Sequence, residues 1–313
     1  MRRELLVVFL GVVLTACGGA GSSSDENGDK NASLDAWPPN EFQEADSYGR
    51  LIDSTVEGVR YRSGNHYGVT DSDGRFGYIK GETIRFYIGD IRIGEPVAPA
   101  ELLTPFEISG SNVYVALNIA RFLQTLDDDA DPENGILINE SIHDFAIGKS
   151  LEFTGDDWDY EPIKSDNNLL DLLVLDLTST TSAGSRSLVS PFRGYNHFGN
   201  TLGGLADDLE SEARDIAAET HCVSDDQCES YELEGSMLEF CRFRGPYIPY
   251  SLMDVEESDF LKKLDERAGL VSLKDSLQLA ADATTDLTGI CIIVGDEKPS
   301  TVCSEKNQCE FKH

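Results

Sequence analysis

The chain has 313 residues, and its 57 acidic and 25 basic residues give a formal net charge of −32 at pH 7. A chain this acidic has no basic stripe to neutralise phosphates, which excludes nucleic acid as a partner and disfavours binding of the protein body to an anionic membrane face. Its length is sufficient for two domains of ordinary size.

Residues 1–16 have the layout of a cleaved secretory signal. Arg2 and Arg3 provide a positive start, and the apolar run over residues 5–14 is shorter than the roughly 20 residues that a membrane-spanning helix needs. Small residues then lead to Cys17. We therefore expect export to an oxidising compartment and cleavage near Cys17.

The segment Leu14-Thr15-Ala16-Cys17 resembles the lipobox of bacterial lipoproteins. This resemblance implies cleavage before Cys17, a diacylglycerol on its thiol and a fatty acid such as palmitate on its new amino group, because several acyl chains anchor stably where one is marginal. Gly18 follows, and the family's usual inner-membrane retention aspartate is absent, which implies the outer membrane in either leaflet. An ordinary signal peptide with a chance cysteine is the alternative.

Residues 17–47 predict a disordered tether behind the lipidated cysteine. The stretch after Cys17 is rich in Gly and Ser and then in Asp and Asn, so it cannot bury enough apolar surface to fold. A flexible chain of this kind reaches on the order of 25 Å. The lipid would therefore hold the body near the membrane without orienting it tightly.

Residues 48–108 predict a small antiparallel β module. Short runs with alternating apolar residues, such as residues 83–88, are separated by turn sequences at residues 70–74 and at Gly89-Asp90. Because Asp-Gly before a strand is a strong hairpin signal, Asp73-Gly74 predicts a hairpin there.

The same block resembles a module of bacterial surface lipoproteins and adhesins. The pattern is carried by Asp53-x-x-Val56-x-Gly58-Val59-x-Tyr61, Thr70-Asp71-x-x-Gly74-x-Phe76-x-Tyr78 and Phe86-x-Ile88-Gly89-Asp90-Ile91-x-Ile93-Gly94. Its turn is also similar to that of transthyretin-like β-sandwiches. The resemblance implies a sandwich that is accessory or adhesive more often than catalytic.

Residues 109–218 predict a mainly helical region. Apolar residues from Val113 to Leu126 recur at helical spacing, with Ser111 or Asn112 able to cap the helix. Residues 118–126 and the following acidic loop also match the surface family. Further helices are expected over residues 169–177 and 205–218, with a loop over residues 178–187.

The acidic loop after this helix predicts a calcium site. Its candidate ligands are Asp127, Asp129, Asp131 and Glu133. Carboxylates at alternate positions suit a hard cation, and acidic residues at a helix C-terminus are otherwise unfavourable against the helix dipole. The loop departs from the EF-hand pattern, since Ile138 stands where a bidentate glutamate belongs. A solvated acidic loop is the alternative.

Residues 219–313 predict a disulfide-stapled α+β module. Its cysteines are Cys222, Cys228, Cys241, Cys291, Cys303 and Cys309. An even number in an exported chain favours disulfides, whose pairing the sequence leaves open, and the spacings lack the close pairs of structural zinc sites. The segment also resembles a six-cysteine module of uncharacterised bacterial secreted proteins, with Cys222 to Cys228 and Gly245 to Ser251 as the matching parts.

Two helices and a strand are expected inside this module. A capping box at Asp254 opens the first helix and Gly269 ends it, while apolar residues over 273–280 predict the second. Residues 290–294 predict a buried strand.

The fold class expected for the whole chain is α+β, and the expected function is non-catalytic. Nucleophile-elbow, phosphate-loop and zinc-protease motifs are absent from the sequence, and its five histidines share no local motif. We expect a membrane-anchored binding or adhesion module that recognises an envelope protein or a glycan, with calcium stiffening one loop. A hydrolase or an enzyme inhibitor carried by the cysteine-rich module is the alternative. A cleft that gathers His, Asp and Ser would favour catalysis.

Overall fold

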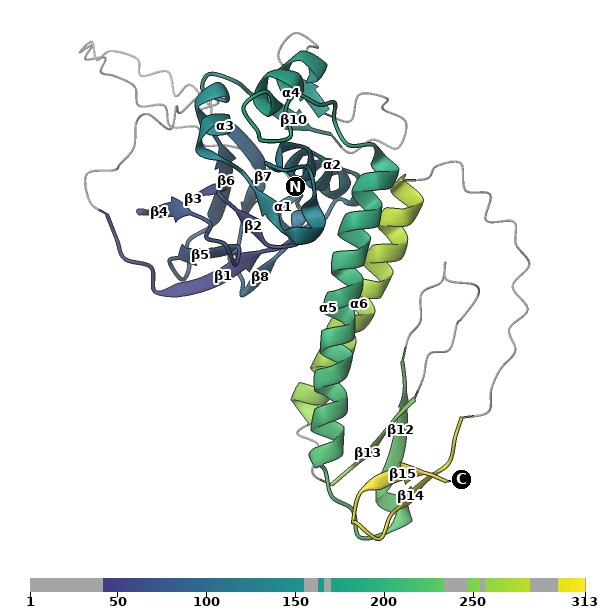
Figure 1. Cartoon of the computed structure of the whole chain (residues 1–313). Helices are drawn as coiled ribbons and strands as arrows, with labels where there is room; N and C mark the ends of the chain where they lie inside the picture. Colours follow the sequence, from purple (N-terminus) through teal and green to yellow (C-terminus); the bar gives the residue numbers. More distant parts are fainter. Residues whose placement is uncertain are drawn as a thin grey trace, which may run out of the picture. The chain divides into compact units, whose positions relative to one another are not determined.

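The computed structural model describes residues 42–154, 163–165, 170–233, 247–253, 257–281 and 298–312, all within one compact unit, residues 33–313 (Figure 1). These residues form an α+β fold, as expected. Cys17, Cys241, Cys291, the capping box at Asp254 and the strand expected over residues 290–294 lie outside the described residues.

Two small sheets make up the β module. The first is antiparallel, with β4 (His66–Val69), β3 (Arg60–Ser63), β6 (Ile84–Ile88) and β7 (Ile91–Val97) in that order. The second contains β5 (Arg75–Tyr78), β1 (Ser47–Leu51) and β8 (Leu102–Leu103), the last parallel to β1. Phe76 of one sheet and Phe86 of the other meet edge to face in a shared buried core.

The hairpin expected around Asp73-Gly74 is wrong, although the turn itself is present. Asp71 organises the turn by accepting hydrogen bonds from the backbone of Asp73 and Arg75, and Gly74 N–H donates to the Asp71 carbonyl. However, β4 pairs with β3 and β5 pairs with β1, so the turn connects the two sheets. The other expected turn, Gly89-Asp90, does join the paired strands β6 and β7.

Helix α2 (Val113–Leu126) begins at the Asn112 cap, whose side chain accepts the N–H groups of Tyr114 and Val115. Its buried face packs on the β module. Helix α1 (Pro105–Ile108) precedes α2, and the described strands and α-helices between α2 and residue 190 are β9 (Ile136–Leu137), α3 (Glu140–Phe145), β10 (Leu151–Phe153), β11 (Ile163–Ser165) and α4 (Leu170–Thr178). Strand β9 pairs in parallel with β2 (Val56–Glu57), so the segment after the acidic loop returns to the β module.

Two long helices lie side by side in Figure 1: α5 (Pro191–Glu219) and α6 (Glu257–Ala281). Phe198 near the start of α5 packs with Leu277 near the end of α6, and Ala213 packs with Phe260. The helices are therefore antiparallel. The expected break at Gly269 is wrong, since α6 runs through it. None of the described helices is long and apolar enough to cross a membrane.

Besides α6, the described part of the cysteine-rich module contains two short hairpins. One pairs β12 (Cys228–Glu232) with β13 (Tyr247–Ser251), and the other pairs β14 (Thr301–Cys303) with β15 (Cys309–Phe311). Disulfides Cys222–Cys303 and Cys228–Cys309 hold the second hairpin against the segment that follows α5. The disulfide prediction is therefore confirmed for these four cysteines.

Candidate functional site

A polar cluster centred on His197 lies where α5, the acidic loop and the segment after β1 meet. His197 is almost fully buried, and its Nδ1 lies 2.9 Å from a carboxylate oxygen of Glu133. On the other side of the ring, Nε2 lies 3.1 Å from Oγ of Ser54 and 3.2 Å from the backbone carbonyl oxygen of Asp53. The cluster therefore links three segments that are distant in the sequence.

The Asp53 carboxylate is the fourth group of this cluster. It is fully buried, and its Oδ2 accepts a hydrogen bond from the Gln124 amide at 3.0 Å. Its Oδ1 makes no hydrogen bond and lies 3.8 Å from Nε2 of His197. Burial, the largest influence, raises the pKa of Asp53 to about 6, while His197 and Gln124 act in the opposite direction.

Charge on the imidazole follows from the same contacts. Burial, which is the largest single influence, lowers the pKa of His197, but Asp53 and Glu133 together outweigh it and the net shift is upward. A protonated ring donates from both nitrogens, one to Glu133 and the other towards Ser54 and the Asp53 carbonyl. The raised pKa favours this protonated form, in which the ring would be a buried cation between two carboxylates.

Ser54, His197 and Glu133 are arranged in the order of a serine-hydrolase triad. Ser54 also has a positive φ of 57°, a sparsely populated conformation for a residue with a side chain. Its hydroxyl, however, donates to the Pro132 carbonyl oxygen at 2.8 Å. One hydroxyl hydrogen cannot serve both Pro132 and a basic imidazole, so the contacts favour a structural role for the hydroxyl.

A cleft of about 530 Å³ opens beside His197 and Glu133. Its apolar wall includes Pro132, Leu188 and Val189, and Arg193 near the start of α5 is exposed at its edge. This volume lies within the range of small-molecule sites in proteins.

The structure separates the four carboxylates predicted to bind calcium. Asp127 and Asp129 line a second hollow of about 320 Å³, whereas Asp131 and Glu133 line the cleft beside His197. Asp129 accepts hydrogen bonds from the Asp131 backbone and the Asn134 amide. The acidic loop therefore contributes carboxylates to two separate hollows.

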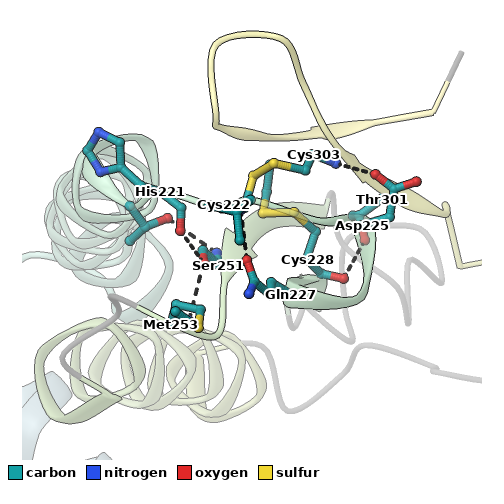
Figure 2. Close-up of a disulfide and its surroundings, with 12 residues drawn as sticks. His221, Cys222, Asp225, Gln227, Cys228, Ser251, Met253, Thr301 and Cys303 are labelled. Atoms are coloured by element: carbon teal, nitrogen blue, oxygen red, sulfur yellow. Dashed lines mark hydrogen bonds between the residues drawn. A yellow bond between two sulfur atoms is a disulfide. The ribbon is translucent and has the colours of Figure 1, made fainter.

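In the cysteine-rich module, the polar contacts near the disulfides are structural (Figure 2). The Ser251 hydroxyl donates to the backbone carbonyl of His221, and Cys303 N–H donates to the Asp225 carboxylate. Three sulfur atoms, from Cys222, Cys228 and Cys303, lie within 4.8 Å of one another. They are close because the two disulfides are adjacent, and a sulfur already bonded in a disulfide is not the thiolate that zinc requires.

Comparison of the chain with models of protein families, with curated proteins and with solved structures gave no match.

Proposed function

We propose that this protein is a lipid-anchored protein of the bacterial outer membrane that acts by binding a ligand. The observation that carries the proposal is the cleft of about 530 Å³ beside His197, which has an apolar wall and an exposed arginine in a chain of net charge −32. The ligand would be an envelope protein or a glycan. Arg193 would contact it from the first turn of α5.

The β module supports the same assignment. Its two sheets share a core in which Phe76 contacts Phe86, an arrangement compatible with the transthyretin-like sandwich that the sequence resembles. Folds of this kind carry adhesive and accessory functions more often than catalysis. Residues 48–108, 109–218 and 219–313 would then be a β module, a helical region and a stapled tail.

The anchor is tested by Cys17→Ser in the full-length protein. Loss of the thiol removes the site of lipidation, so the variant should leave the membrane fraction for the soluble fraction. Metabolic labelling with a fatty-acid analogue should mark the wild type and leave the variant unmarked. Unchanged membrane retention would contradict the lipid assignment.

The binding cleft is tested by crosslinking in intact cells, followed by purification of the full-length protein. Arg193→Glu reverses the charge at the cleft edge and should abolish capture of the partner. Arg92→Glu is the matched control, because Arg92 is exposed on β7 outside the cleft. Equal capture by the wild type and by both variants would exclude this cleft as the binding site.

A serine hydrolase is the second candidate function, favoured by the 3.1 Å and 2.9 Å contacts of His197 with Ser54 and Glu133. It differs from an enzyme carried by the cysteine-rich module, because its residues lie in the other two regions. An active enzyme would be labelled at Ser54 by a fluorophosphonate probe, and both Ser54→Ala and His197→Ala would lose the label. The binding function predicts no labelling of the wild type.

A further inference from the structure

Asp127 has an unsatisfied oxygen in a buried position. Its side chain is 1% exposed, and Oδ1 accepts a hydrogen bond from the backbone of Leu137 at 2.9 Å. The other oxygen, Oδ2, is buried and has no hydrogen-bond partner among the described residues. Because desolvating a carboxylate is costly, buried carboxylates are normally paired or bound to a metal ion.

The Asp129 carboxyl group increases this cost. Burial, the largest influence, and the adjacent Asp129 carboxyl raise the pKa of Asp127 to about 6. In turn, the pKa of Asp129 is lowered, chiefly by the hydrogen bond from Asn134. Two carboxyl groups this close require either a shared proton or a cation between them.

The N–H groups of the Arg186 guanidinium have acceptors other than the carboxylate oxygens of Asp127 and Asp129. Arg186 directs its N–H groups at the backbone carbonyls of Thr125, Asp127 and Gly184 and at the Thr181 hydroxyl. Its charge acts on the acidic loop only through space. The third acidic residue, Asp128, is already satisfied, because its side chain accepts from Asn139 and from the backbone of Ser182.

The hollow in front of Asp127 and Asp129 is rich in oxygen atoms. Thr55, Glu57 and Ser72 line it from the β module, and Asn134 lines it from the loop. Apart from the disulfide sulfurs, the described residues contain no group of three metal-binding side chains within 4.8 Å. Glu57 and Asp128 also line the hollow, but neither forms such a group with Asp127 and Asp129. The site therefore offers two carboxylates and neutral oxygens, a donor set that suits Ca²⁺ and excludes soft metals.

We propose that Asp127 and Asp129 bind a calcium ion in this hollow, with Thr55, Ser72 and Asn134 as the neighbouring neutral oxygen donors. The ion would neutralise the buried Oδ2 of Asp127 and fix the acidic loop against the β2–β9 pair. This site replaces the sequence-based ligand set, because Glu133 faces His197 instead. It stands whether or not the neighbouring cleft binds a ligand.

The test is thermal unfolding of the full-length protein in detergent, first stripped with chelator and then titrated with calcium. Millimolar calcium, the range in which extracellular modules bind, should raise the Tm of the wild type by about 5 °C or more. Asp127→Asn should abolish this rise. It should also melt at or above the wild type in chelator, because it removes the buried charge while keeping the shape.

Two further variants complete the test. Asp129→Asn changes an exposed side chain, so the variant should fold and bind calcium at least tenfold more weakly by calorimetry. Asp131→Asn is the matched control, since it removes the same charge from the same loop outside the hollow, and it should respond as the wild type does. A wild-type Tm indifferent to calcium, or an equal rise in Asp127→Asn, would overturn the proposal. An equal response to magnesium would overturn the choice of calcium.

Discussion

Nδ1 of His197 lies 2.9 Å from a carboxylate oxygen of Glu133, which ties the first third of α5 to the acidic loop. The other side of the ring faces Ser54 and the buried Asp53. One imidazole thus connects the β module, the loop and the long helix. The raised pKa of His197 favours the protonated ring, which can donate hydrogen bonds from both nitrogens.

Replacing His197 with alanine should destabilise the protein strongly. The substitution removes the imidazole beside Asp53, whose side chain is fully buried, and leaves that carboxylate with only the Gln124 amide. Breaking a buried pair in this way costs about 3–5 kcal/mol. Urea denaturation of the variant and the wild type at pH 7 measures the loss of unfolding free energy, provided that the two proteins have the same m-value.

Glu133→Gln serves as a comparison with His197→Ala, and it should lower the unfolding free energy far less. The Glu133 side chain is 65% exposed, and ion pairs of exposed side chains contribute about 0–1 kcal/mol. A loss as large as that of His197→Ala would show that Glu133, and not Asp53, is the main partner of the ring.

The protein should gain stability on mild acidification in the absence of calcium. Asp127 and Asp53 have pKa values raised to about 6, in both cases chiefly by burial, so each binds a proton more tightly in the folded state. Their stabilising contribution is complete below pH 4 and is lost as the pH rises to about 6. His197, whose pKa is also raised, loses its contribution at higher pH.

The variant Asp127→Asn isolates one of these groups. In chelator, the unfolding free energy of the wild type should fall relative to this variant by about 2 kcal/mol between pH 4 and pH 6, and the two should run parallel above about pH 7. Denaturation curves across that range measure the difference. A constant difference between the two proteins would contradict the raised pKa.

Local sequence patterns were sufficient to predict the helices and strands that bury one face in the core. The start of α2 was predictable because Asn112 precedes a run with helical spacing, and both signals act within one turn. The failures concern tertiary contacts. The Asp73-Gly74 turn is locally encoded, but the sheet that β5 joins is decided by its pairing with β1. Gly269 costs only about 1 kcal/mol in a helix, which packing of α6 against α5 offsets.

The His197 cluster was not predictable for the same reason. Ser54 and Glu133 lie 143 and 64 positions from His197, so no local spacing brings them together. Asp53 is part of the sequence pattern of the β module, but a charged side chain is normally expected at the surface, so its burial was not predicted. In the acidic loop, the alternating carboxylates indicated hard donors. The division of the loop between two hollows could not be read from them, because it depends on the 3-10 helix η2 over Pro132–Asn134.

Gly58→Ala should disrupt the β2–β9 contact. A methyl group at Gly58 would lie 2.0 Å from the carbonyl oxygen of Ile138, and the residue has a φ of +88°. The positive φ alone costs about 1–2 kcal/mol, and displacing the backbone of Ile138 should add about 1–3 kcal/mol. Gly81→Ala is the control, because Gly81 has the same φ with no atom within 4 Å of the added methyl. Chemical denaturation should show the greater loss for Gly58→Ala, and equal losses would contradict the close approach.

Reduction of the disulfides should release the C-terminal hairpin while leaving the β module folded. Strands β14 and β15 have three residues each, and a two-stranded hairpin of this size is marginal in water. The bridges Cys222–Cys303 and Cys228–Cys309 both span 81 positions, and closing one such loop contributes about 4–5 kcal/mol in the chain-entropy model. The second bridge adds less, because the two loops nearly coincide.

Hydrogen exchange with and without reductant checks this expectation. Exchange should accelerate over residues 298–312 and stay slow in the buried strands β3 and β6. The double variant Cys222→Ser with Cys303→Ser should retain most of the protection, since Cys228–Cys309 still holds the hairpin against β12. Unchanged exchange after full reduction would mean that backbone contacts such as Cys222 N–H to the Asn307 carbonyl, and not the bridges, keep the hairpin in place.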